Sequence, residues 1–283
     1  MNTDKAIDLH LHTLASDGTS TATEVVERAR HFRIDAIAMT DHDSVESIDE
    51  ARWMGEKLGI EIISGIELSA YHGESELHIL GYFFDDKDLE FCKALKKFCE
   101  EREKRIHQIV EKLTKAGVRI TLEDVTKLSG EGAPGRLHVA RALVEKRIVT
   151  DTREAFRRFL SYGKPAYVEK EKISTQEAIQ MLKVIGGVPV LAHPGLLHRD
   201  DLIPQLVREG LMGLEVYHTE HSQNAIEHYK ELTQVHRLVM TGGSDCHGEA
   251  KGKFLIGKNR IPYHLLEPLR KAHESIMKIQ TSK

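Results

Sequence analysis

Four short segments, far apart in the chain, combine histidine with aspartate or a tight turn, and each follows or lies within an apolar run typical of a buried β-strand. They are residues 8–12 (DLHLH), 40–43 (TDHD), 192–195 (AHPG) and 244–247 (SDCH). Imidazole nitrogens and carboxylate oxygens are ligands that divalent metal ions accept. A barrel gathers such side chains at the ends of its strands. The sequence therefore predicts a barrel whose rim binds metal, as in a metallohydrolase.

Seven runs rich in apolar and β-branched residues predict the strands of this barrel. They cover residues 6–12, 34–40, 60–68, 77–84, 188–192, 214–218 and 238–242. Helical patterns separate most of these runs, and Thr21 and Ser174 each begin an S/T-x-x-E capping box. Alternating strands and helices predict parallel strands in right-handed βα units. The expected fold is α/β, a distorted (β/α)7 TIM-like barrel.

The pattern changes after the fourth strand, where charged helical stretches follow one another and no convincing strand is found. We expect a small α-helical domain inserted at residues 96–165, between two barrel segments at residues 1–95 and 166–283. Residues 96–165 carry 17 Lys and Arg against 10 Asp and Glu, whereas the remainder carries 23 against 34. A basic insertion beside an acidic, metal-binding body predicts an anionic substrate between them. A solvated helix surface explains the same charge equally well.

The candidate metal ligands follow from strand geometry. His10 and His12 are two residues apart in an extended run, so both imidazoles project from one face. Asp17 lies in the turn beyond them, where a purely structural role is the alternative. A lone histidine in an apolar run is more often a core residue, but convergence on one rim favours ligation. The full candidate set is His10, His12, Asp17, His42, Glu67, His78, His193, Asp245 and His247.

Nine ligands are too many for a single ion, because one catalytic zinc uses about three protein ligands. We therefore expect two to three divalent ions, bridged by Glu67, with His193 and Asp245 as further catalytic residues. For substrate contacts we expect Arg136, which precedes a helix, Lys164 where the chain returns to the barrel, Arg102 and His218. For each basic residue, a solvated or salt-bridged side chain is the alternative.

The sequence also indicates where the protein works. The N-terminus has no apolar signal region, and no apolar run approaches the roughly 18 residues that span a membrane. Cys92, Cys99 and Cys246 form neither a CxxC motif nor an even set, so we expect neither disulfides nor a zinc ribbon. We expect a cytoplasmic protein with no membrane attachment and no obligate protein partner.

The segments DLHLHT, TDH, GIE, AHP and SDCH, in this order, resemble the motifs of the PHP (polymerase and histidinol phosphatase) family. SDG at residues 16–18, GRLHVAR at 135–141 and YGKPAYV at 162–168 are similar to the branch that acts on 3′,5′-bisphosphonucleotides and RNA 5′ ends, the ribonuclease AM type. The resemblance implies a distorted (β/α)7 barrel and a trinuclear site, usually loaded with manganese, iron or zinc. All nine candidate ligands match the family pattern.

The expected function is a metal-dependent phosphoesterase that removes the 3′-phosphate of nucleoside 3′,5′-bisphosphates, for example to AMP, and also acts 5′–3′ on short RNA. Mn²⁺ is the expected metal, with Fe²⁺ or Zn²⁺ as alternatives. A histidinol-phosphate phosphatase or another phosphomonoesterase remains open, and a substrate panel would decide. A weakly active nucleic-acid-binding PHP module is the alternative of another class, but no ligand of the set is missing.

Overall fold

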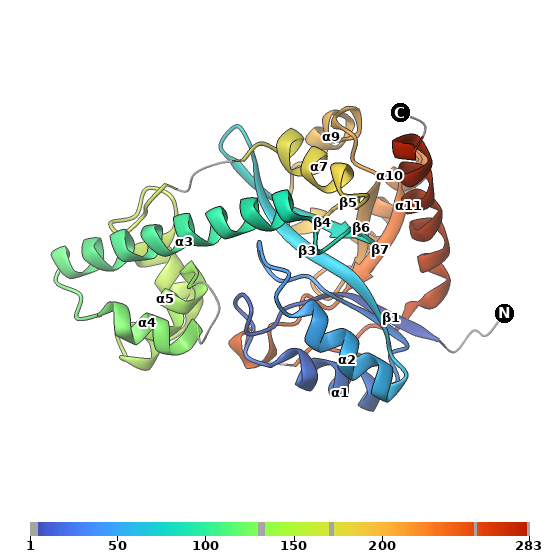
Figure 1. The fold of residues 1–283 in the computed structure, drawn as a ribbon. Coiled ribbons are helices and arrows are strands. Elements are labelled where there is room, and N and C mark those ends of the chain that lie inside the picture. The colour runs from blue at the N-terminus through green and yellow to red at the C-terminus, as the bar shows by residue number, and fades with distance from the viewer. Residues whose placement is uncertain (1–4, 130–133, 170–172, 252–253, 282–283) are drawn as a thin grey trace.

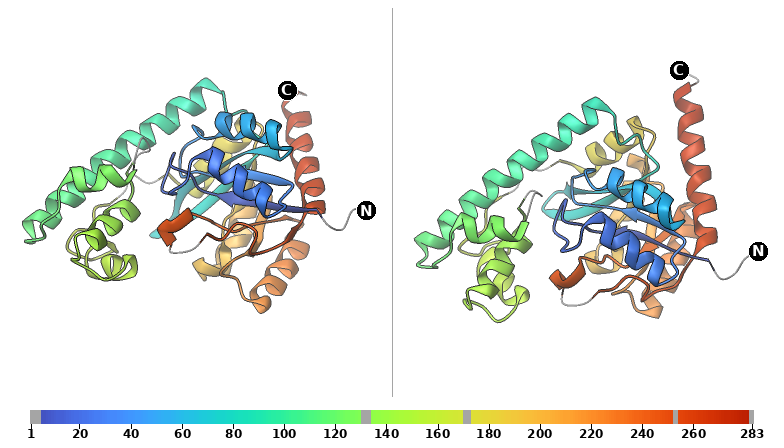
Figure 2. Two further views of the ribbon diagram at one scale, coloured as in Figure 1. Left: turned by 90° about the horizontal axis from the view of Figure 1, so that it is seen from below. Right: turned by 60° about the horizontal axis from the view of Figure 1, so that its bottom comes forward.

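The computed structural model describes residues 5–129, 134–169, 173–251 and 254–281. One strongly curved sheet forms the body of the molecule, and helices surround it (Figure 1). The helices α3, α4 and α5 project to one side, while α11 runs along the opposite side of the barrel (Figures 1 and 2). In the described parts of the chain, no helix is both long and apolar enough to cross a membrane.

The sheet has eight strands in the order β7-β6-β5-β4-β3-β2-β1-β8. All seven predicted strands are present, and the two-residue strand β8 is an addition that the sequence did not predict. The bounds are β1 Ala6–Leu11, β2 Ala36–Met39, β3 Glu61–His72, β4 Ser75–Tyr82, β5 Val188–Leu191, β6 Gly213–His218, β7 Val239–Gly243 and β8 Ile261–Pro262.

The expectation of parallel strands throughout is wrong at β4, which runs antiparallel to both β3 and β5. Only two residues separate β3 from β4, and Gly73 has a φ of 58° in this turn. A parallel connection needs a crossover of a dozen or more residues, so a two-residue link permits only a hairpin. The reversal matters for the site, because it brings the first half of β4, including His78, to the rim where the parallel strands end.

The ends of the sheet meet beside β1. Leu11 forms a parallel bridge with Cys246, and the backbone N–H of His12 donates to the carbonyl of Cys246 at 3.0 Å. A Cβ atom at Gly243 would lie 2.2 Å from the Cβ of His10, so only glycine allows β7 to approach β1 this closely. The sheet is thereby a nearly closed barrel, which confirms the predicted fold class.

Helices cover the barrel on its outer side. α1 and α2 pack on the first strands, α7, α9 and α10 on the later ones, and α11 closes the remaining side. Both predicted capping boxes are present, at Thr21 and Ser174. The bounds are α1 Ala22–His31, α2 Ile48–Leu58, α7 Thr175–Val184, α8 Pro194–Leu197, α9 Ile203–Glu209, α10 Gln223–His236 and α11 Leu266–Thr281.

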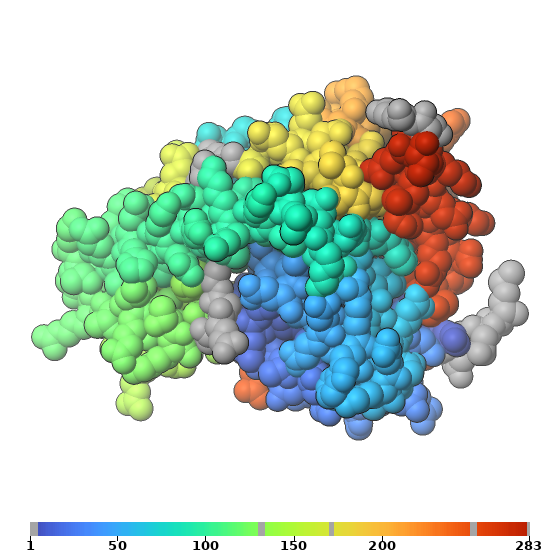
Figure 3. All heavy atoms as spheres, in the orientation of Figure 1, coloured from blue at the N-terminus to red at the C-terminus, as the bar shows by residue number. Residues whose placement is uncertain are grey.

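The insertion has an apolar core of its own. Its elements are α3 Leu89–Lys115, α4 Leu122–Ser129, α5 Arg136–Glu145, α6 Thr152–Ala155 and a π-helix over Phe156–Leu160. The first turns of α3 pack on the barrel through Phe91 and Leu95, whereas its later turns belong to the insertion core. Ala166 and Val168 also belong to that core. One helix thus spans both bodies (Figure 3), and the division at residues 96 and 165 stays a prediction.

Candidate metal centre

Glu67 lies at the middle of the rim and is almost completely buried, at 1% exposure. Its Oε2 atom faces three imidazole nitrogens, at 3.3 Å for His10 Nε2 and at 3.2 Å for both His12 Nε2 and His42 Nδ1. None of these three nitrogens has a hydrogen-bond partner among the described residues. A buried polar atom without a partner is costly, so this arrangement calls for an additional ligand.

The second oxygen of Glu67 faces the other side of the rim. Oε1 lies 2.8 Å from His78 Nδ1 and 3.1 Å from His193 Nε2. Five histidines from four strands or strand ends, β1, β2, β4 and β5, therefore surround one carboxylate. Burial alone would raise the pKa of Glu67, but the charges of His42, His78 and His10 hold it well below its usual value. The carboxylate is ionised, which is the form that binds a cation.

The hydrogen bonding of His10 indicates that its Nε2 atom needs a cation as a partner. Its Nδ1 donates a hydrogen bond to the buried carboxylate of Glu215 at 2.9 Å. The neutral ring then carries its lone pair on Nε2, which faces Glu67 and, at 3.5 Å, Asp245 Oδ1. A lone pair opposite two carboxylate oxygens is repulsive unless a cation lies between them. That cation is either a proton or a metal ion, so the donor set fits a metal.

A second group of possible ligands lies beside the first. One ligand atom each from His12, Asp17, His42 and His247 lie within 4.8 Å of one another. His247 Nδ1 donates to the carbonyl of Asp245 at 3.0 Å, which turns its Nε2 toward Asp17 Oδ1 at 3.2 Å. Two further groups, His10–His12–Glu67 and His42–Glu67–His78, share members with this one. Shared ligands are expected when several ions lie close together.

Asp245 connects the histidines on the far side of Glu67. Its Oδ1 lies 3.2 Å from His12 Nε2, and its Oδ2 lies 3.5 Å from His218 Nε2. Asp245 and His193 both have a positive φ, of 51° and 27°. Non-glycine residues adopt such backbone angles rarely, and often at functional sites. The structure thus brings all nine predicted ligands to one rim.

Burial and charge shift the histidine pKa values in opposite directions. Burial, opposed by the carboxylates, lowers the pKa of His42 to about 3. Burial also acts to lower the pKa of His12, but Asp245 and Glu67 outweigh it and raise the value to about 9. Neighbouring imidazoles in one cluster cannot all be protonated, because their positive charges repel one another. Some rings therefore carry a proton, while others are neutral and offer a lone pair to a metal ion.

Glu215 in β6 is a functional residue that sequence reasoning missed. Its side chain is fully buried, and its Oε2 also accepts the backbone N–H of His193 at 2.7 Å. It therefore fixes the position of two candidate ligands, and buried carboxylates of this kind are the usual partners of metal-binding histidines. The available signal was a lone glutamate inside an apolar strand that ends at His218.

Aspartates next to the motifs hold the backbone of the rim. Asp41 accepts hydrogen bonds from Thr13 N and from the hydroxyls of Thr13, Ser16 and Ser47. Asp8 accepts the backbone N–H of Ser244 at 2.8 Å, and burial raises its pKa to about 6. These bonds join segments that are distant in sequence, so the ligands are positioned before any ion binds.

A cavity of about 160 Å³ opens beside the metal centre, and we call it the basic pocket. On the barrel side, three candidate ligands line it: Asp17, His42 and His78. On the insertion side, three arginines line it: Arg102, Arg105 and Arg136. Arg102 forms an ion pair with Asp43, and Arg136 lies 2.9 Å from Glu76. The structure thus places Arg102 and Arg136, two of the four predicted substrate contacts, at this cavity.

The other two predicted contacts lie elsewhere. Lys164 is exposed in the turn after the π-helix and, contrary to expectation, does not line the basic pocket. The reason is that the following segment, through Ala166 and Val168, packs into the insertion core instead of returning directly to the rim. His218 is 1% exposed and does not line the pocket either. Its Nε2 atom lies 3.5 Å from Asp245 Oδ2, so it faces a candidate ligand instead of open space.

Arg105 is the most informative residue of the basic pocket. It is 8% exposed, and its Nε donates to the carbonyl of Val168 at 2.9 Å. It forms no ion pair with a carboxylate in the described parts of the chain, and burial, followed by the charge of Arg136, lowers its pKa. A buried guanidinium without an anion is unfavourable. The pocket therefore favours an anionic ligand.

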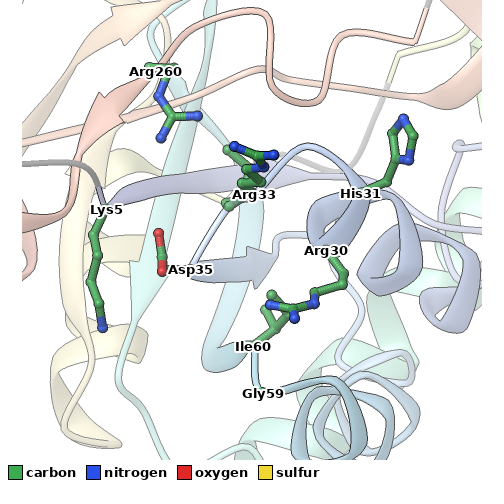
Figure 4. A pocket seen from close by; sticks show the side chains of 9 residues that line it. Lys5, Arg30, His31, Arg33, Asp35, Gly59, Ile60 and Arg260 are labelled. Atoms are coloured by element: carbon green, nitrogen blue, oxygen red, sulfur yellow. The ribbon is translucent and has the colours of Figure 1, made fainter.

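A further hollow, of about 570 Å³, lies at the opposite end of the barrel, where β1, β2 and β3 begin (Figure 4). Exposed basic side chains, including Lys5, Arg30 and Arg33, surround Asp35, whose carboxylate accepts the N–H of Ala6. Arg30 and Arg33 lie at the end of α1, where cations offset the helix dipole. None of the nine candidate ligands lines this hollow, so it is separate from the chemistry of the rim.

Comparison with known proteins agrees with this geometry. The model of the PHP domain family matches residues 8–278, and the chain belongs to this family. A protein of similar structure, described as a metal-dependent phosphoesterase from Bifidobacterium adolescentis, has a TM-score of 0.87 at 30% identity and covers 95% of this chain and 96% of its own.

Three relatives of similar length cover most of the chain. A 3′,5′-nucleoside bisphosphate phosphatase from Chromobacterium violaceum is 32% identical over 89% of this chain and 90% of its own. The 5′-3′ exoribonuclease Rnm of Escherichia coli is 33% identical over 85% and 84%. A phosphoribosyl 1,2-cyclic phosphate 1,2-diphosphodiesterase from Eggerthella lenta is 33% identical over 86% and 94%. All three names describe cleavage of phosphate esters, the activity class that the sequence predicted.

Proposed function

We propose that this chain hydrolyses the 3′-phosphate of nucleoside 3′,5′-bisphosphates with two to three divalent ions, and that it also acts on short RNA from the 5′ end. Mn²⁺ is the first candidate metal, and Fe²⁺ and Zn²⁺ are the alternatives. A cytoplasmic location is part of the proposal, supported by three cysteines that are all free thiols. The observation that carries the proposal is a basic pocket that shares Asp17, His42 and His78 with the metal centre.

The rim residues would hold the ions in three overlapping groups, two of which contain Glu67, whose two oxygens face different histidines. Divalent ions, when bound, lower the pKa of water and stabilise charge on a phosphoryl group. The chain itself supplies the alignment. Glu215 fixes His10 and His193, and Asp245 lies between His12 and His218, so the donors keep their positions during the reaction.

The insertion residues would hold the second phosphate of the substrate. Arg105 lacks a carboxylate partner among the described residues, and Arg136 is close enough to influence its pKa. A phosphate there would give Arg105 the anion that it lacks and would also contact Arg136, which pairs with Glu76. Planar guanidinium groups bind phosphate oxygens in pairs. The substrate would then lie with one phosphate in the basic pocket and the other at the metal centre.

In this orientation, hydrolysis of the 3′-phosphate forms one bond to phosphorus and breaks one. Water adds its oxygen to the 3′-phosphorus, the bond between phosphorus and O3′ breaks, and O3′ takes up a proton. Adenosine 3′,5′-bisphosphate would give AMP and inorganic phosphate. The same bond cleavage on RNA would release the first nucleotide as a 5′-monophosphate, consistent with the names of the relatives from Chromobacterium violaceum and Escherichia coli.

A substrate panel on metal-reconstituted protein tests the proposal. We expect adenosine 3′,5′-bisphosphate to release phosphate faster than histidinol phosphate does. A phosphoribosyl 1,2-cyclic phosphate belongs in the panel, because the Eggerthella lenta relative is equally similar and its substrate also carries two phosphates. Turnover of the cyclic phosphate or histidinol phosphate without turnover of the bisphosphate would overturn the proposed substrate. No turnover of any of them would favour a nucleic-acid-binding module.

Metal content provides an independent test of the centre. The nine converging donors predict two to three metal equivalents per chain after reconstitution with excess Mn²⁺, followed by removal of free metal. Elemental analysis measures this number directly. A reproducible single equivalent would overturn the multi-ion centre, whatever the substrate proves to be.

A further inference from the structure

A second cavity at the rim has a different chemical character, and we call it the apolar hollow. Its volume is about 220 Å³, and it lies where β4, β5 and α8 meet. His78 and His193, two candidate ligands on the Oε1 side of Glu67, form part of its wall. The hollow therefore borders the metal centre, on a side that the proposed bisphosphate substrate does not need.

The lining of the apolar hollow indicates the kind of group that it accepts. Leu196, which is 42% exposed, and the partly buried Leu197 contribute apolar surface, and the core residues Leu77 and Leu191 lie behind it. No lysine or arginine is among its lining residues, and Glu76 is the one carboxylate among them. A phosphate would meet no lysine or arginine side chain there. The hollow suits an uncharged, flat and largely apolar group.

The two cavities flank the metal centre and share Glu76 and His78. On one side, three arginines offer a place for a terminal phosphate; on the other, leucines offer a place for an uncharged ring. An RNA chain has this order of groups when it is read from its 5′ end: a 5′-phosphate, the first nucleoside, the scissile phosphate and then the second nucleoside.

We propose that the apolar hollow binds the base of the second nucleotide of an RNA substrate, immediately downstream of the bond that is cleaved. The proposal rests on the function proposed above and adds to it a site that distinguishes RNA from a bisphosphate. A hollow of about 220 Å³ is smaller than the roughly 300–1,000 Å³ of sites that enclose whole small molecules. It therefore fits one base, while the following nucleotides extend into solvent.

The chemistry is the same for both substrates. Water adds to phosphorus, the bond to O3′ of the first nucleotide breaks, and O3′ takes up a proton. With the dinucleotide pApA, the phosphate remains attached to O5′ of the second adenosine, so the products are two molecules of AMP. With pAp, a hydroxyl replaces the second adenosine and the hollow stays unused. Base contact in the hollow should thus affect only the dinucleotide.

Leu196→Ala provides the test, because this half-exposed side chain on α8 can be shortened without opening the core. Three substrates are compared on metal-loaded protein: pAp, pApA and the same dinucleotide without its second base. We expect kcat/KM for pApA to fall about 5- to 10-fold, since removal of apolar contacts to a ligand has an effect of this order. The values for pAp and for the abasic substrate should change less than about twofold. Val235→Ala, an exposed residue on α10, is the matched control.

The outcomes separate this inference from the proposed function. If the wild type cleaves pAp but Leu196→Ala cleaves all three substrates as the wild type does, the hollow does not bind the base and the inference is wrong. If Leu196→Ala slows all three substrates equally, the residue supports the metal centre, which also contradicts the inference. If the wild type cleaves none of them, the proposed function fails first.

Discussion

The barrel rim and the helical insertion both present charged groups to the basic pocket, but they hold them differently. Buried partners fix several residues at the rim, as Glu215 fixes His10 and His193. The insertion contributes arginines from a separate apolar core, and Arg105 has no carboxylate partner in the described regions. A fixed, multiply supported centre suits the reaction, whereas a cationic surface on another body suits selection of the substrate.

The largest expected effect lies at the rim. Glu67→Gln removes the charge that faces five histidines and should lower kcat/KM on the order of 10³-fold or more for every substrate. Phosphate release and bound metal are measured together, with circular dichroism to verify folding. Glu231→Gln, an exposed change on α10, serves as the control. Retention of activity and metal by Glu67→Gln would show that the centre lies elsewhere.

The next effect lies in the insertion and should depend on the substrate. Arg105→Met keeps the apolar stem but removes the charge, so kcat/KM for adenosine 3′,5′-bisphosphate should fall about 10- to 100-fold, as expected for a charged hydrogen bond. Adenosine 3′-monophosphate lacks the second phosphate and should react as with wild type. Arg119→Met, an exposed site of the insertion, controls for net charge. An equal loss with both substrates would argue against phosphate recognition by Arg105.

Glu215→Gln tests whether the buried support of the rim affects metal binding. The amide keeps an oxygen acceptor but loses the charge that orients His10. Metal affinity should fall about 10-fold or more, and excess Mn²⁺ should restore most of the activity. Titration of activity against free Mn²⁺ measures the shift. An unchanged titration curve would mean that Glu215 contributes only to packing.

The smallest effect concerns the stability of the insertion at acidic pH. His138 is 1% exposed and accepts a hydrogen bond from the N–H of Gly135. Burial lowers the pKa of His138 to about 4, and the smaller effects on this pKa come from Asp17, Arg141, Arg102 and His247. The folded state therefore binds fewer protons than the unfolded state, so stability is full above pH 6.5 and decreases as the pH falls toward 4. His138 should account for about 1 kcal/mol lost between pH 7 and pH 5.5.

Unfolding in urea at the two pH values measures this contribution when wild type is compared with His138→Gln, which keeps an acceptor for Gly135. The variant should lose less stability on acidification than the wild type does. Parallel losses in the two proteins would exclude His138 as the responsible group.

The sequence predicted the strands and the convergence of the nine candidate ligands on one rim, because both depend on local patterns; metal binding by these residues stays a prediction. An apolar run that ends in histidine or aspartate can be recognised in one dimension, and a parallel barrel collects such ends by topology. The direction of β4 was missed although the eight-residue gap between residues 68 and 77 was visible, because the alternation of strands and helices was weighted above the length of the connection.

The remaining features depend on contacts between distant segments. In the sequence, Glu215 resembles any other strand residue. Only the fold shows that it lies beside His10, 205 positions away. Lys164 looked like a rim residue because the chain returns to the barrel nearby, but the apolar contacts of Ala166 and Val168 keep this turn on the insertion. Arg105 differs from the other cations of α3 only in its burial without a carboxylate partner among the described residues.

The most direct test of this division of roles is the ratio of kcat/KM for adenosine 3′,5′-bisphosphate to that for adenosine 3′-monophosphate, measured in wild type, Glu215→Gln and Arg105→Met at saturating metal. We predict a wild-type ratio of about 10 or more, from one charged phosphate contact. The ratio should be unchanged in the rim variant and close to one in the insertion variant. A wild-type ratio near one, or a ratio that falls as much in Glu215→Gln as in Arg105→Met, would contradict the account.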